Sequence, residues 1–477
     1  MSIKKNFAFN AVLSISQIIF PIITFPYVTR ILEPEGLGSI NFIDSFVQYL
    51  IIVSALGIPI YGVREIAKIK NDKEKLSKTF SELVIIHSTL AIICSIIFMF
   101  LLQFVPKLFA EYELCIIGIF VILSNVFLLN WFFAGLEKFA FISTISLLVR
   151  VLTIICIFLF VKSPADKVLY YSFNLLANII TGIIGIAYAR KYIQFTFKSP
   201  NFKAHFGSLF FLFSLSVITS VYVLLDSVIL GFLKNNSEVG YYSTAMKISK
   251  IPIALLTALT SVLLPKLSSI EFGDEFNRLV NKAMRFSFLI SIPISLGLFI
   301  LSREIILIFA GNLYLPALSS FRILSFIIIP IGFALINYQV LLPYNREKYM
   351  MFAALVGVFV SLLLNFLLIP YLGNQGSAIS SLSTEVVVAM ILFLLSYKLC
   401  KFDIPYKLIL NSFLTCGVMF IIKHFIYYFS DNSLTIIIGT AILGSLSYFT
   451  IMGCVFKNEI VVEMFVSFKE KIFQKRI

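Results

Sequence analysis

Long apolar runs separated by short polar connections extend along the whole chain. About 20 mostly apolar residues are needed for a helix to cross a bilayer, and these runs are continuous rather than alternating, which excludes a β-barrel. The pattern predicts fourteen spans, at residues 7–29, 40–63, 80–105, 114–135, 140–161, 168–189, 206–233, 239–265, 280–302, 315–341, 349–370, 376–398, 405–429 and 434–456. We therefore predict an all-α integral membrane protein with about 14 transmembrane helices.

The composition supports the same class. The 477 residues are 60% hydrophobic and only 13% charged, with a mean hydropathy of +1.00. Soluble domains carry about 25% charged residues, and a soluble core has no room for this much apolar surface. The helices must therefore be exposed to lipid.

The basic residues gather in alternate connections. The net charge is +14, and 27 of the 38 Lys and Arg residues lie at the N-terminus, in the C-terminal tail and in every second loop, such as 64–79 and 190–205. The loops on the other side of the membrane carry six Lys and Arg residues. Because basic loops remain in the cytoplasm, this asymmetry predicts an inner-membrane protein with both termini cytoplasmic. The 190–205 loop is expected either to lie in the headgroup plane or to form an ordinary connection.

Several kinds of chemistry have no motif in this sequence. The six Cys form no CxxC pair, the three His are scattered, and neither a P-loop nor an HExxH sequence occurs. We expect no metal and no cofactor, and no means of hydrolysing ATP. If the protein is a transporter, its energy would then have to come from an ion gradient, of H+ or Na+.

A weak internal repeat divides the chain. Asn130-Trp131 precedes Glu137-Lys138-Phe139, and about two hundred residues later Asn337-Tyr338 precedes Glu347-Lys348-Tyr349. The spacing predicts a six-helix lobe at 1–200, a second at 201–402, and two extra helices with a basic tail at 403–477. Parallel halves related by an axis along the membrane normal are a transporter design.

Eight charged residues lie at membrane depth in the predicted spans, where each costs about 2.5–3.5 kcal/mol on insertion scales and usually faces a cavity or a partner. They are Asp44, Arg150, Asp226, Lys247, Lys250, Arg322, Glu385 and Lys423. With Arg30 at the outer interface, the basic residues suggest a cationic cavity, for which the substrate-binding candidates are Arg30, Arg150, Lys247, Lys250 and Arg322. The acids Asp44, Asp226 and Glu385 are the ion-coupling candidates.

Other roles stay open for these polar residues. Asp226 and Lys247 lie at similar predicted depth and are equally suited to a structural ion pair. Intramembrane amides such as Asn174 and Asn178 suit sugar hydroxyls, but also suit hydrogen bonds between helices.

The N-terminal quarter carries a motif. The run 26–38 reads PYVTRILEPEGLG, and 56–67 reads LGIPIYGVREIA. This motif resembles the bacterial oligosaccharide flippases that export O-antigen repeat units, within the superfamily that also holds multidrug (MATE) exporters and lipid II flippases. Glu33 is a departure, because the family pattern usually has Gly there.

The resemblance implies two six-helix lobes in a MATE-like arrangement around a central cavity. It implies alternating access, with an undecaprenyl-pyrophosphate-linked oligosaccharide as substrate, and contact with membrane lipids, a polysaccharide polymerase and a chain-length regulator, but no nucleic acid. Two alternatives are an ion-coupled multidrug exporter, which would favour an acidic cavity, and a membrane polymerase or glycosyltransferase, which would need a larger outer loop.

Overall fold

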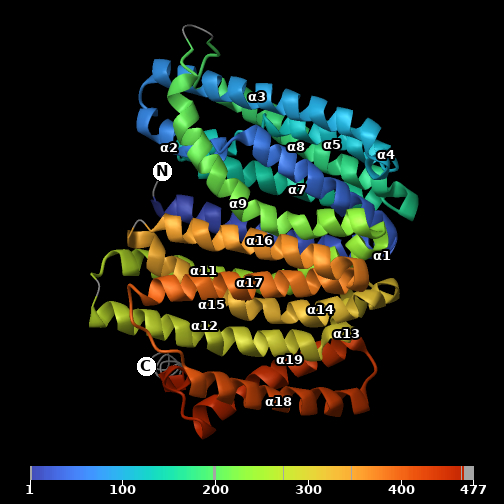
Figure 1. The fold of residues 1–477 in the computed structure, drawn as a ribbon, viewed down its shortest axis with the longest axis vertical. Helices are drawn as coiled ribbons and strands as arrows, with labels where there is room; N and C mark the ends of the chain where they lie inside the picture. The colour runs from blue at the N-terminus through green and yellow to red at the C-terminus, as the bar shows by residue number, and fades with distance from the viewer. Residues whose placement is uncertain (1–2, 197–199, 272, 345, 464, 467–477) are drawn as a thin grey trace, which may run out of the picture. The chain divides into compact units, whose positions relative to one another are not determined.

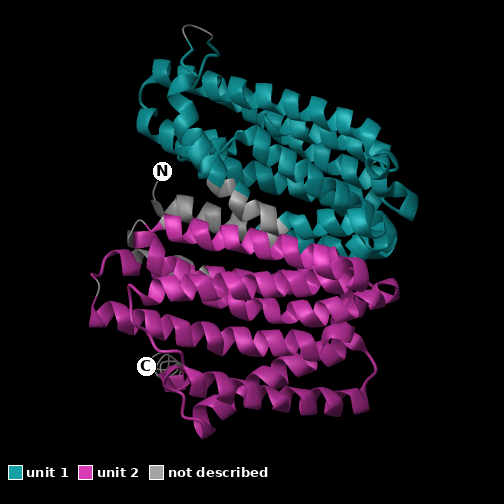
Figure 2. Cartoon of the chain, in the orientation of Figure 1, with its two compact units in different colours: residues 1–240 teal, residues 241–477 magenta. Residues whose placement is uncertain are grey.

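The computed structural model describes residues 3–196, 200–271, 273–344, 346–463 and 465–466. Every regular element among these residues is a helix (Figure 1), which confirms the all-α class. The chain forms two compact units, residues 1–240 and 241–477 (Figure 2). The finer division into lobes at 1–200 and 201–402 stays a prediction.

Unit 1 is built on its first helix, α1, which packs against α3, α5, α7 and α9. The helices of this unit are α1 Ile3–Ala55, α2 Ile58–Ile69, α3 Lys73–Phe104, α4 Pro106–Phe109, α5 Tyr112–Asn125, α6 Asn130–Gly135, α7 Phe139–Phe160, α8 Lys167–Ala189 and α9 Lys203–Leu233. Helix α10, Asn236–Lys250, begins in unit 1 and continues into unit 2.

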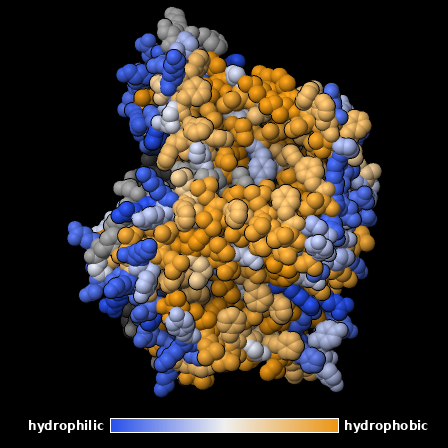
Figure 3. All heavy atoms as spheres, viewed as in Figure 1, coloured by the Kyte–Doolittle hydropathy of each residue, from blue (hydrophilic) through white to orange (hydrophobic). Residues whose placement is uncertain are grey.

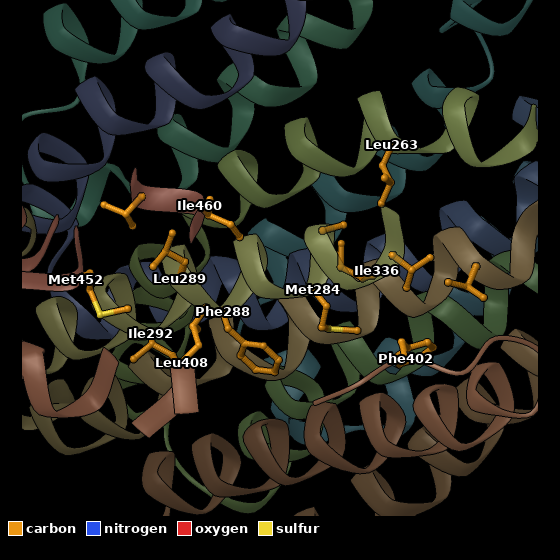
Figure 4. Close-up of a cluster of buried hydrophobic side chains, with 14 of the residues drawn as sticks. Leu263, Met284, Phe288, Leu289, Ile292, Ile336, Phe402, Leu408, Met452 and Ile460 are labelled. Atoms are coloured by element: carbon orange, nitrogen blue, oxygen red, sulfur yellow. The ribbon is translucent and has the colours of Figure 1, made fainter. Parts of the chain in front are cut away.

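Unit 2 packs α15 against α11, α12 and α17, and α18 against both α12 and α19. Its helices are α11 Ile253–Ser268, α12 Asp274–Ile300, α13 Ser302–Phe309, α14 Leu318–Leu324, α15 Ile328–Leu341, α16 Glu347–Leu372, α17 Asn374–Tyr397, α18 Tyr406–Phe429 and α19 Ser433–Thr450. A buried cluster that includes Met284, Phe288, Ile336 and Met452 joins these helices (Figure 4).

Eleven stretches among the described residues are long and apolar enough to cross a membrane, so the count of fourteen is not confirmed. The predicted span 40–63 lies within the single stretch Ile19–Ile69, which also includes residues 19–29 of the predicted span 7–29. The predicted span 239–265 is divided at Ile251–Pro252 between α10 and α11. In Figure 3 apolar residues cover the middle of each unit's visible face, and hydrophilic residues gather toward the helix ends, as a bilayer requires.

Helix α1 contains a sharp break at Glu33, where φ is 57° and ψ is 174°. Residues other than glycine rarely adopt this backbone conformation, and holding one there costs about 1–3 kcal/mol. The following Pro34 has no N–H to continue the helix. Glycine adopts this backbone conformation without strain, which agrees with the Gly that the resemblance leads us to expect at this position.

Candidate functional site

A polar cavity of about 460 Å³ lies within unit 1. Phe20, Pro21 and Thr24 line it from the first part of α1, and Asp44 and Gln48 from the part after the break. The remaining lining residues come from α5, α7 and α8: Val121, Arg150, Thr153, Ile154, Ile157, Tyr170, Tyr171, Asn174, Ala177 and Asn178. The fold therefore brings two predicted site residues, Asp44 and Arg150, into one cavity together with both amides of α8.

The carboxylate of Asp44 is held by its neighbours. The hydroxyl of Tyr171 donates to Oδ1 of Asp44 at 3.2 Å, and the Gln48 amide donates to the same oxygen at 3.5 Å. Tyr171 is buried, whereas Asp44 is half-buried. These contacts stabilise a charged carboxylate at membrane depth.

Arg150 has a different environment. It is half-buried on α7, and neither a hydrogen bond nor an ion pair joins its guanidinium to another residue in the described part of the chain. The guanidinium carries five donors in a planar fork, so Arg150 is available to a ligand in the cavity.

The other predicted site residues lie outside this cavity. Arg30 and Lys247 are exposed, Lys250 and Glu385 are half-buried, and Asp226 is buried on α9. Their assignment to a substrate cavity or to ion coupling stays a prediction. So does the pairing of Asp226 with Lys247, because the two residues belong to different units.

Arg322 is positioned by α13 and α12. Its Nε donates to Oγ of Ser302 at 3.1 Å, and its guanidinium carbon lies 6.0 Å from the centre of the Phe299 ring. The side chain therefore remains within unit 2.

Lys423 forms a salt bridge that the sequence does not indicate. Its Nζ donates to Oε2 of Glu304 at 2.9 Å and to the carbonyl of Ile300 at 2.7 Å. Lys423 lies on α18 and the buried Glu304 on α13, so this salt bridge joins the two helices.

The motif residues 34–38 pack tightly at one end of unit 1. A Cβ at Gly38 would collide with the backbone of Asn236, and one at Gly240 with the backbone of Pro34. Nearby, Oε1 of Glu111 accepts hydrogen bonds from Ser39 at 2.6 Å and from Asn236 at 2.8 Å. Its other oxygen lies 2.7 Å from Nζ of Lys167. This part of the motif therefore has a packing role, separate from the cavity.

A buried triad lies at the opposite end of unit 1, in the region of the basic loops. The hydroxyl of Tyr61 lies 2.7 Å from Nδ1 of His205, whose Nε2 lies 2.9 Å from Oε2 of Glu82. All three residues are buried. Sequence reasoning missed this triad, since an isolated His gave no hint of its partners; the one available signal was that Tyr61 belongs to the motif.

Helix α3, which carries Glu82 of the triad, also holds the 190–205 connection. Backbone N–H groups of Gln194 and Thr196 donate to Ser77 and Ser81 of α3, each at 3.1 Å. The Asn201 N–H donates to Oε1 of Glu82 at 2.7 Å. The described residues of this connection are therefore bound to α3, a contact that neither of the two expectations included.

Another motif residue, Arg64, is more than half exposed and forms an ion pair with the adjacent Glu65 at 3.2 Å. Its charge is therefore partly balanced within α2.

A helical, membrane-spanning chain with a polar cavity among its helices has the features of a multi-pass membrane transporter. Residues 3–271 match the family model described as polysaccharide biosynthesis protein, and the chain belongs to that family. The resemblance inferred from the motif is thus confirmed.

Relatives and solved structures agree with this family. The chain is 28% identical over 393 residues to a candidate O-antigen transporter of Shigella dysenteriae, covering 81% of this chain and 98% of that protein. An inward closed structure of the lipid II flippase MurJ matches with a TM-score of 0.78 at 18% identity, covering 95% of this chain and 100% of that one. An inward-facing multidrug resistance MATE family transporter of the MOP superfamily matches with a TM-score of 0.65 at 15% identity, covering 81% and 97%. The MATE-like fold and the prediction of a transporter rather than an enzyme are confirmed.

Proposed function

We propose that this protein flips a lipid-linked oligosaccharide across the bacterial inner membrane, for the synthesis of O-antigen or a related surface polysaccharide. The observation that carries the proposal is the cavity of unit 1, because it supplies polar groups to a substrate at membrane depth. A glycan joined to a lipid through pyrophosphate cannot cross hydrocarbon without such groups. The flippases among its relatives and the MurJ fold support the same function.

In this proposal the basic residues of the membrane segments attract the substrate. Arg binds phosphate or hydroxyl oxygens through its planar fork and Lys acts as a point charge. Arg30, Arg150, Lys247, Lys250 and Arg322 are the proposed contacts. The excess of these bases over the intramembrane acids disfavours the cationic drugs that a multidrug exporter would carry.

Transport would proceed by alternating access driven by an ion gradient. The sequence holds no nucleotide-binding motif, so H+ or Na+ is the proposed driving ion. Asp44, Asp226 and Glu385 are the proposed ion carriers. Of these, Asp44 is the one that lies in the cavity together with Arg150. The orientation proposed from the basic loops places both termini in the cytoplasm.

Deleting the gene tests the function directly. We expect one surface glycan to disappear and its lipid-linked unit to accumulate, and a plasmid copy to restore export. Plasmid copies with Arg150→Ala, Lys250→Ala or Arg322→Ala should insert into the membrane normally but export less glycan. Normal surface glycan in all three variants would refute the proposal that these basic residues bind the substrate. A deletion strain that loses drug resistance and keeps its glycan would instead support the multidrug exporter.

A further inference from the structure

The cavity of unit 1 has balanced charge and mostly neutral polar groups. Nine of its fifteen lining residues have polar side chains, and seven of those nine are uncharged. Asp44 is the one acid and Arg150 the one base. A pyrophosphate needs a surplus of positive charge and a metal cation a surplus of negative charge, and this cavity offers neither.

Four of the uncharged groups, those of Thr24, Gln48, Thr153 and Tyr171, donate to protein groups, whereas the two amides of α8 remain for a ligand. Asn174 and Asn178 lie one helical turn apart on α8, and both line the cavity. Among the described residues no hydrogen bond joins either amide to another protein group. Each amide offers two donors and an acceptor oxygen, and such groups are costly at membrane depth unless water or a ligand binds them. Arg150 adds five further donors from α7.

Aromatic residues line the same space. Phe20, Tyr170 and Tyr171 supply ring surfaces beside these amides. A sugar ring has matching chemistry, because its hydroxyls both donate and accept while its C–H faces are apolar. The volume of about 460 Å³ also falls in the ~300–1,000 Å³ range of small-ligand pockets.

We propose that this cavity is a saccharide subsite, which binds sugar residues of the transported glycan and leaves the pyrophosphate to basic residues elsewhere. The assignment rests on the proposed function and adds to it which part of the substrate binds in unit 1. Arg150 and the α8 amides hydrogen-bond sugar hydroxyls, while Asp44 is held in place by Tyr171 and Gln48 and accepts from a further hydroxyl.

Two probes separate the glycan from the pyrophosphate. The first is the free glycan, released by mild acid from the lipid-linked unit that accumulates in the deletion strain. The second is undecaprenyl pyrophosphate without sugar. The full-length protein in nanodiscs is titrated with each probe, as wild type, as Asn174→Ala/Asn178→Ala, and as the milder Asn178→Ala. Ser172→Ala is the matched control, because this hydroxyl is on the same helix, donates to the Val168 carbonyl at 2.8 Å and does not line the cavity.

We expect the double variant to lose about tenfold in affinity for the free glycan, as the loss of two hydrogen bonds implies. Asn178→Ala should lose less, and the control should match wild type. The affinity for undecaprenyl pyrophosphate should stay within about twofold in all four proteins.

Two results would overturn the assignment alone: unchanged glycan affinity in both variants, or an equal loss for both probes in variants that unfold at the wild-type temperature. If the deletion strain keeps its surface glycan and accumulates no lipid-linked unit, the proposed function fails and the saccharide subsite fails with it.

Discussion

Replacing Glu82 by alanine tests how unit 1 holds the 190–205 connection. Glu82 is 4% exposed and accepts two hydrogen bonds, from the His205 ring and from the Asn201 backbone. A hydrogen bond to a charged group contributes about 1.5–3 kcal/mol. Glu82→Ala removes both bonds and leaves the buried His205 ring nitrogen without its partner. We therefore expect this change to lower the free energy of unfolding by about 3–6 kcal/mol, the sum for two such bonds.

The protein carries its own reporter for this experiment. Trp131 is the single tryptophan of the chain, and its ring lies 5.8 Å from that of Phe80, two residues before Glu82 on α3. Its fluorescence during denaturant unfolding should show the transition move to lower denaturant. Glu74→Ala is the matched control, since Glu74 is exposed on the same helix, and it should change stability by less than about 0.5 kcal/mol.

A double-mutant cycle identifies the contact responsible. Combining Glu82→Ala with His205→Ala should cost clearly less than the sum of the two single changes, with a coupling energy of about 1–3 kcal/mol. Additive effects, or a Glu82→Ala shift no larger than that of the control, would refute the reasoning, because the triad would then contribute nothing to stability.

Three further predictions follow from single sites. Glu33→Gly should raise the unfolding midpoint in a thermal scan. Glycine removes about 1–3 kcal/mol of backbone strain, and the larger conformational entropy of glycine in the unfolded chain offsets only part of this gain. A lower midpoint would count against the strain at residue 33. Lys423→Leu should destabilise by about 3–5 kcal/mol by leaving Glu304 unpaired, and the double change with Glu304→Leu should recover most of the loss in the same scan. The hydrogen bond from Lys70 holds the pKa of the Glu137 carboxyl below its usual value of 4.5. This contribution is present above the usual pKa and is lost as the pH falls through the lowered one, so Lys70→Ala should matter at pH 7 and have no effect in strong acid, as paired unfolding curves at the two pH values would show.

The hydropathy pattern predicted the helical class because a bilayer leaves few choices. Every backbone group in hydrocarbon must be hydrogen-bonded within the protein, so a long apolar run becomes a helix whatever its neighbours are. The count was less secure. The predicted span 239–265 includes Lys247, Lys250 and Pro252, and hydropathy does not show that the helix ends near them.

The sequence by itself determined the class, the alternation of basic loops and the family, because these depend on composition, on length and on a contiguous motif. The contacts of the site were decided only by the tertiary structure. Asp44 and Arg150 lie on α1 and α7, and it is the packing of α1, α7 and α8 that puts them with Asn174 and Asn178 in one cavity. The same holds for Lys423 with Glu304, since a side chain's partner depends on which faces of two distant helices meet, and no local pattern records that.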